Sequence, residues 1–173
     1  IAEYGGRAVG LSGRADGMLR AKKVEKLRTK KGAMVDPGRV GEMGEVRTEL
    51  LGSLVKGGFI PVIAPIAVDE RGAALNVNAD LVASAVAGAL RAEKLVLMTD
   101  IEGVRNDQGH LQPSLDRATI SAWLDRGVIN GGMIPKVRCA LEALGAGVGK
   151  VHIVDGRMEH AILLEIFTDR GIG

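Results

Sequence analysis

A glycine-rich turn that runs into a helix combines the residue types that hold a phosphate group. The turn is Gly131-Gly132, and the predicted helix begins near Ile134 and carries Lys136 in its first turn. Glycines let backbone N–H groups approach an anion, and a helix N-terminus adds free donors and positive potential. A lysine is not favoured at a helix N-terminus unless an anion lies beside it. The pattern predicts an anion site, although a plain loop-to-helix junction with a surface lysine fits the local sequence equally well.

Polar segments follow two of the short apolar stretches that predict buried strands. One is 99–103, TDIEG, after the apolar segment 94–98, and the other is 155–157, DGR, after 151–154. Ligands of open α/β sheets bind outside the carboxyl ends of the strands, so both segments are candidate ligand contacts. The segment 99–103 is also typical of an ordinary strand-ending turn.

The segment 76–80, NVNAD, introduces a predicted helix and offers further polar side chains. In the functional interpretation, Asn76 donates a hydrogen bond to a substrate and the Asp80 carboxylate holds lysines in place. The alternative is that Asn78 or Asp80 only caps the helix, as Asn and Asp commonly do.

Predicted strands and helices alternate along the chain around these segments. We expect buried strands at 59–66, 94–98 and 151–154, and helices at 47–56, 81–92, 114–127, 134–144 and 158–167. The apolar run 59–66 predicts a strand buried on both faces, whereas its two prolines, Pro61 and Pro65, favour a position near a sheet margin. Residues 59–99 read as one strand–helix–strand unit with parallel strands. Ser114 or Thr119 is the expected cap of its helix, and the alternation as a whole predicts the α/β class.

Composition and motif searches exclude several classes of protein. The chain has 173 residues, a net charge of +2 and one cysteine, so it is not polybasic as a whole and cannot form an intrachain disulfide. No apolar run is long enough for a membrane helix, and neither a P-loop nor a Cys/His metal set is present. We expect Cys139 to be buried and His110 to be exposed in a turn. No signal peptide is recognised, so we expect a cytoplasmic protein.

Basic residues gather in one segment, 20–31. They are Arg20, Lys22, Lys23, Lys26, Arg28, Lys30 and Lys31. The pattern predicts a solvated hairpin with charged edges, and the alternative is an anion-binding or partner-binding face. Because no aromatic residues interleave with the charges, single-stranded nucleic acid is not favoured as a partner.

Together these motifs resemble the amino acid kinase superfamily and, within it, the family of acetylglutamate kinases. The resemblance covers essentially the whole chain, and its pieces run in order through 5–17, 40–46, 57–72, 76–80, 92–104, 131–137, 151–157 and 160–173. It implies an α/β fold, a three-layer αβα sandwich with a mainly parallel central sheet. It also implies transfer of the γ-phosphoryl group of ATP to the side-chain carboxylate of N-acetyl-L-glutamate, in arginine biosynthesis, with Mg²⁺ accompanying the nucleotide.

The resemblance also implies roles for individual residues. Lys136 would stabilise charge on the transferring phosphoryl group, Asp80 would hold the catalytic lysines, and Asn76 would bind acetylglutamate. The residues implied to lie around the nucleotide are Thr99, Asp100, Gly103, Gly132 and Met133. No protein metal ligands are expected.

The last segment, 160–173, is similar to the end of family members that arginine inhibits. The similarity implies that Glu165 and Gly171 contact the arginine, with His152 or His160 nearby. The alternative is an ordinary terminal helix and strand.

The family has a phosphate-binding lysine, a glycine-rich loop and a substrate arginine in a portion that precedes the matching segments. We therefore expect a C-terminal part of the enzyme, truncated at its N-terminal side and inactive alone, whose complete form is a homo-oligomer without a nucleic-acid or membrane partner. Residues 1–90 would finish the acetylglutamate lobe, and 91–173 would form the ATP lobe. The alternatives are a family member with another carboxylate or a carbamate as acceptor, and a non-catalytic regulator that binds arginine or a nucleotide.

Overall fold

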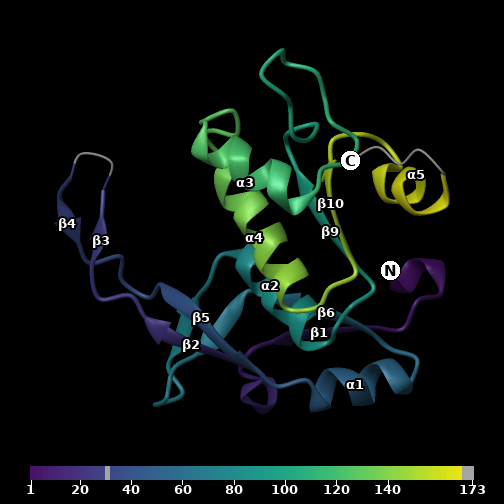
Figure 1. The fold of residues 1–173 in the computed structure, drawn as a ribbon. Coiled ribbons are helices and arrows are strands. Elements are labelled where there is room, and N and C mark those ends of the chain that lie inside the picture. Colours follow the sequence, from purple (N-terminus) through teal and green to yellow (C-terminus); the bar gives the residue numbers. More distant parts are fainter. Residues whose placement is uncertain (30–31, 169–173) are drawn as a thin grey trace. The chain divides into compact units, whose positions relative to one another are not determined.

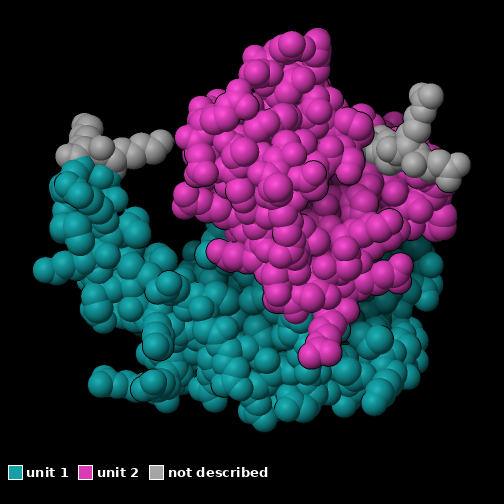
Figure 2. Space-filling view, in the orientation of Figure 1, with its two compact units in different colours: residues 1–90 teal, residues 91–173 magenta. Residues whose placement is uncertain are grey.

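The computed structural model describes residues 1–29 and 32–168, and the chain divides into two compact units, Ile1–Leu90 and Arg91–Gly173 (Figures 1 and 2). Unit 1 contains η1 (Ala2–Tyr4), β1 (Ala8–Ser12), η2 (Ala15–Gly17), β2 (Leu19–Lys23), β3 (Leu27–Arg28), β4 (Met34–Val35), β5 (Gly41–Val46), α1 (Glu49–Lys56), β6 (Ile60–Ala64), β7 (Ile66–Val68), β8 (Ala74–Asn76) and α2 (Ala79–Ala89). Unit 2 contains β9 (Lys94–Thr99), α3 (Arg117–Asp125), α4 (Met133–Gly145), β10 (Lys150–Asp155) and α5 (Ala161–Phe167).

Unit 1 combines a parallel strand pair with a mixed sheet. Strands β1 and β6 are parallel, with Ala8 opposite Ile60 and Ser12 opposite Ala64. The mixed sheet has the order β5-β2-β7-β8, in which β2 is parallel to β7 and the other neighbours are antiparallel. The hairpin of β3 and β4 extends beyond β2 and β5 (Figure 1). The α/β class is therefore confirmed.

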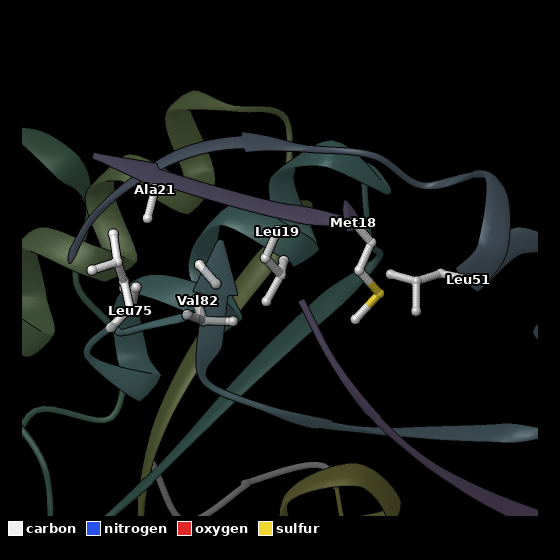
Figure 3. Packing of buried hydrophobic residues seen from close by; sticks show 8 residues of the cluster. Met18, Leu19, Ala21, Leu51, Leu75 and Val82 are labelled. Carbon is white, nitrogen blue, oxygen red and sulfur yellow. The ribbon is translucent and has the colours of Figure 1, made fainter. Parts of the chain in front are cut away.

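The core of unit 1 lies between the mixed sheet and its helices. Met18, just before β2, points toward Leu51 of α1, and both side chains are almost completely buried (Figure 3). Leu19, Leu75 and Val82 continue the same apolar cluster from β2, β8 and α2. These residues come from four elements, β2, α1, β8 and α2, so their burial holds the elements of unit 1 together.

Unit 2 is built on the parallel pair β9 and β10, against which α4 packs (Figure 1). Its apolar cluster joins Ile120 of α3 to Met133 and Val137 of α4. Cys139 is buried on α4 and His110 is exposed in a turn, as expected. None of the helices in the described residues is long and apolar enough to cross a lipid bilayer.

The run 59–66 does not form one strand buried on both faces. It divides at Pro65 into β6 and β7, and Ile60 and Val62 are each 46% exposed. A proline has no N–H for the strand ladder, which explains the break. The expected parallel unit over 59–99 is also wrong in its pairing, because β6 pairs with β1 whereas β9 pairs with β10.

Two helix predictions also need correction. The cap of α3 is Asp116, whose carboxylate accepts a hydrogen bond from the Thr119 N–H at 2.7 Å, so neither Ser114 nor Thr119 is the cap. This hydrogen bond lowers the pKa of Asp116. The last helix is shorter than expected, because the segment that precedes Ala161 forms turns instead of the start of α5.

The described part of the basic segment forms β2 and β3, and β3 pairs with β4 in the expected hairpin. Lys22, Lys23, Lys26 and Arg28 are exposed on or next to β2 and β3, and Arg20 is half-buried. The carbonyl of Asp69 accepts a hydrogen bond from the Arg20 guanidinium at 3.3 Å. Lys30 and Lys31 lie outside the described residues.

Candidate functional site

The carboxyl ends of β9 and β10 bring two of the polar segments together. Asp155 lies opposite Thr99 in the parallel register, and the Gly156 N–H donates a hydrogen bond to the Thr99 carbonyl at 2.8 Å. The turns at 99–103 and 155–157 therefore share one sheet edge, which is the edge at which α/β proteins bind ligands.

The turn after β9 has a conformation that depends on glycine. Thr99 is buried and its hydroxyl donates to the Asp100 carboxylate at 3.3 Å, while Asp100 itself is exposed. Gly103 has a φ of +142°, and a Cβ at this position would lie 2.9 Å from Leu111 Cδ1. Any larger residue at 103 would therefore have to displace Leu111 and strain the backbone.

The turn after β10 is held by an arginine–carboxylate pair. Arg157 donates to Asp155 from Nε at 2.9 Å, from Nη2 at 2.7 Å and from the backbone N–H at 3.0 Å. The side-chain hydrogen bonds from Arg157, followed by the backbone bond, lower the pKa of Asp155 to about 2. The carboxylate therefore stays ionised at any ordinary pH, and the two-pronged contact fixes the guanidinium in place.

The glycine turn at the start of α4 has the geometry of an open anion site. Gly131 has a φ of +55°, and Gly132 is the N-terminal cap of a 13-residue helix. Added Cβ atoms at both glycines would meet nothing within 4 Å, so their backbone is open to an approaching group. Lys136 is half-buried in the first turn of α4, where Pro135 is tolerated because its missing N–H has no helical partner there.

The predicted nucleotide residues all lie in unit 2. Met133 belongs to the apolar cluster against which Ile101 and Val104 pack, so the start of α4 and the turn after β9 share one core. Unit 2 therefore places a strand-end turn, a glycine turn and a lysine in one neighbourhood, a combination that is compatible with phosphate binding.

Asn76 and Asp80 lie in unit 1. Asn76 ends β8, and its backbone N–H donates to the Arg39 carbonyl at 2.7 Å. Asn78 caps α2, because its side-chain oxygen accepts from the N–H groups of Asp80 at 2.9 Å and Leu81 at 3.2 Å. The cap is thus Asn78 and not Asp80. The Asp80 carboxylate is half-buried, and its predicted role in the site is taken up under the proposed function.

A hollow at the carboxyl ends of β1 and β6 is a feature that the sequence did not single out. It has a volume of about 620 Å³ and is lined by Gly10, Ser12, Ala15, Val62 and Ala64 among others. The small residues of 10–15 are the signal that sequence reasoning could have used, but the parallel pairing of two distant strands was needed to recognise it.

The predicted effector residues are brought together only in part. His152 Nδ1 on β10 is paired with the Glu165 carboxylate on α5, and Glu165 is only 7% exposed. His160 is exposed and pairs with Glu159 at 3.5 Å, so it is not part of this contact. Gly171 lies outside the described residues.

The described part of the chain has no group of three or more His, Cys, Asp or Glu side chains that could hold a metal ion. Mg²⁺ usually keeps several waters and binds through substrate phosphates. An Mg²⁺ ion delivered together with a nucleotide would need no such group.

Comparison with known proteins agrees with the α/β class. The model of the amino acid kinase family matches residues 1–155. The chain belongs to the amino acid kinase family.

The acetylglutamate kinase of Geotalea uraniireducens is 53% identical over 176 residues, which cover 100% of this chain and 60% of that protein. The chain thus spans about 60% of the length of the curated relatives that it matches first. Among solved structures, N-acetylglutamate synthase of Neisseria gonorrhoeae, complexed with coenzyme A and L-arginine, has a TM-score of 0.80 and 25% identity, covering 97% of this chain and 37% of that one. A carbamate kinase of Giardia has a TM-score of 0.67 at 17% identity, covering 94% of this chain and 61% of that one, and shows the fold alone.

Proposed function

We propose that the protein to which this chain belongs is an acetylglutamate kinase of arginine biosynthesis, and that it acts in the cytoplasm. The observation that carries the proposal is the 53% identity to an acetylglutamate kinase over the whole chain. The reaction transfers the γ-phosphoryl group of MgATP to the side-chain carboxylate of N-acetyl-L-glutamate, which gives an acyl phosphate and ADP.

Phosphoryl transfer depends mainly on positioning and on stabilisation of charge. The side-chain carboxylate of the acceptor attacks the γ-phosphorus, and the bond from that phosphorus to the bridging oxygen of ADP breaks. We propose that Lys136 stabilises the negative charge that develops on the transferring phosphoryl group. Its position in the first turn of α4, beside the open backbone of Gly132, supports this assignment.

The remaining residues bind the two substrates. We propose that the nucleotide contacts Thr99, Asp100, Gly103, Gly132 and Met133 of unit 2. Asn76 would bind acetylglutamate, and Asp80 would orient the catalytic lysines. Asn76 lies at the end of β8 and Asp80 in the first turn of α2. Because regular elements hold side chains more precisely than loops do, these positions support the two proposed roles. The lobe assignment follows, with residues 1–90 for acetylglutamate and 91–173 for ATP.

The acceptor is tested with the complete protein that contains this chain, by following ADP formation from MgATP. N-acetyl-L-glutamate should support turnover, whereas glutamate, aspartate and carbamate should support little. Equal rates with glutamate and acetylglutamate would favour a relative with another acceptor. Binding of nucleotide or arginine without any transfer would favour a non-catalytic regulator.

Arginine inhibition is a further part of the proposal. It is supported by the buried Glu165 carboxylate, which can accept charge-assisted hydrogen bonds from a guanidinium, and by the arginine-bound synthase of the same fold. Replacement of Glu165 by alanine should relieve inhibition by L-arginine while the uninhibited rate stays near wild type. Unchanged inhibition in Glu165→Ala would contradict this role. We also propose that the complete protein is a homo-oligomer, which light scattering during gel filtration checks.

A further inference from the structure

The proposed reaction assigns no role to the segment 155–157, DGR, at the carboxyl end of β10. Its side chains are nevertheless held firmly. Asp155 is buried and receives three hydrogen bonds from Arg157, and its carbonyl accepts a further bond from the Met158 N–H at 3.2 Å. A guanidinium whose rotamer is fixed by two parallel hydrogen bonds is pre-organised to interact with a further group.

The segment is also joined to the turn that follows β9. Gly156 donates its N–H to the Thr99 carbonyl, and a Cβ at 156 would lie 3.3 to 3.5 Å from atoms of Met98 and Thr99. The backbone of 156 therefore lies in close contact with the last residues of β9.

The charge of Arg157 interacts electrostatically with the acidic residues of that turn. Asp155 is the main cause of a raised pKa of Arg157, and the carboxylates of Asp100 and Glu102 raise it further. Glu102 also pairs with Arg105. Asp155 occupies two of the five guanidinium N–H donors, so three remain for other groups. The Arg157 side chain is 64% exposed at the ligand edge of the sheet.

We propose that Arg157 is a positioning residue for nucleotide binding: Asp155 holds its guanidinium, and its charge holds the acidic turn at 100–102 in the arrangement that binds the nucleotide. The inference rests on the proposed use of ATP by unit 2, but it is independent of which acceptor is phosphorylated. Without Arg157, two carboxylates at the end of β9 would face an anionic nucleotide with less compensating charge, and the turn would lose a fixed partner.

The test compares three variants of the complete protein with the wild type. Arg157→Gln removes the charge, Arg157→Lys keeps the charge without the two-pronged contact, and Asp155→Asn keeps Arg157 but removes the charge that holds it. Arg126→Gln is the matched control, because Arg126 is also 64% exposed and pairs with Asp107 at 3.8 Å in the same unit. The measurements are direct titration with a fluorescent ATP analogue, the KM for ATP, the KM for the acceptor, kcat and the melting temperature.

Arg157→Gln should weaken binding of the ATP analogue and raise the KM for ATP about tenfold, the effect of losing one charge-assisted contact. The KM for the acceptor and kcat should change less than about twofold, Arg157→Lys should recover part of the loss, and Arg126→Gln should match the wild type. Asp155→Asn should also weaken binding of the ATP analogue, as Arg157→Gln does.

Two results would overturn the inference. The first is that Arg157→Gln binds the analogue with wild-type affinity. The second is that all kinetic parameters and the melting temperature become uniformly worse in Arg157→Gln and are not restored in Arg157→Lys. This second result would mean that the Asp155–Arg157 pair has only a structural role. A wild type that binds the analogue but does not phosphorylate acetylglutamate would refute the proposed acceptor and leave this inference standing. A wild type that binds no nucleotide would overturn both.

Discussion

At the scale of single residues, chemistry here depends on charges placed at the ends of regular elements. Lys136 begins α4 beside two open glycines, and Arg157 follows β10 with its guanidinium on Asp155. Lys136 lies beside the dipole of a helix N-terminus, and Arg157 lies against a carboxylate. Substitution at Lys136 is therefore expected to change the rate, whereas loss of the Asp155–Arg157 pair is expected to change the stability at a given pH.

Lys136→Ala in the complete enzyme should lower kcat by about 10²- to 10³-fold, the usual effect of removing one group that stabilises transition-state charge. Lys136 is only half-buried, so the free energy of unfolding should change by less than about 1 kcal/mol. Steady-state kinetics and urea unfolding measure both quantities, with Arg138→Ala, an exposed cation on the same helix, as the control. Near-normal turnover in Lys136→Ala would remove this lysine from the mechanism.

The Asp155–Arg157 pair predicts a dependence of stability on pH. The folded state lowers the pKa of Asp155 from 3.8 to about 2, so the pair stabilises the protein fully above about pH 4. This contribution is lost as the pH falls through the interval from about 4 to 2, where the folded carboxylate becomes protonated. The difference in free energy of unfolding between wild type and Asp155→Asn should therefore shrink over that interval. A constant difference from pH 6 to pH 2 would contradict the assignment.

At the scale of elements, glycines decide how closely strands and turns approach each other. Gly13 follows β1 and donates its N–H to the Ile66 carbonyl at 2.7 Å. An added Cβ there would lie 2.5 Å from both the Ile66 carbonyl oxygen and Leu19 Cβ. A Cβ added at Gly10, within β1, would meet nothing within 4 Å. Two glycines three residues apart thus have different physical roles.

Gly13→Ala should lower the free energy of unfolding by about 2 kcal/mol, because overpacking forces the backbone of β7 or the side chain of Leu19 to move. Gly10→Ala, the matched control, should change it by less than about 0.5 kcal/mol. Urea unfolding followed by circular dichroism compares the two. Equal effects of the two substitutions would show that the close approach at Gly13 is not retained in solution.

At the scale of the whole molecule, the chain consists of two units, each with its own apolar cluster. The candidate nucleotide residues belong to unit 2, whereas Asn76 and Asp80 belong to unit 1. Ligands that bind only the folded protein raise its stability by mass action.

MgATP at about 100 times its Kd should stabilise the complete protein by about 2.7 kcal/mol, which corresponds to a rise in melting temperature of about 5 to 10 °C. Thermal unfolding with increasing MgATP measures the shift. Magnesium tripolyphosphate at the same concentration is the control for general anion effects. An identical rise with tripolyphosphate would mean that the nucleoside is not recognised.

Much of the local structure was predictable. The helices α1, α2 and α4 and the strands β9 and β10 follow from apolar spacing and from glycine stops such as Gly57 after α1 and Gly147 after α4. The cap of α3 was missed because several polar residues precede that helix and only the backbone geometry selects Asp116. Pro65 lies inside the apolar run 59–66, but its missing N–H breaks this run into β6 and β7.

The sequence by itself determined the α/β class, the glycine turn before Lys136 and the polar segments that end the strands, because these depend on residues close together in the chain. The tertiary structure decided that β6 pairs with β1, that Gly156 bonds to Thr99 and that His152 rather than His160 meets Glu165. Such contacts join residues that are between 13 and 57 positions apart. They depend on strand register and on the packing of whole elements, which no local pattern of residues specifies.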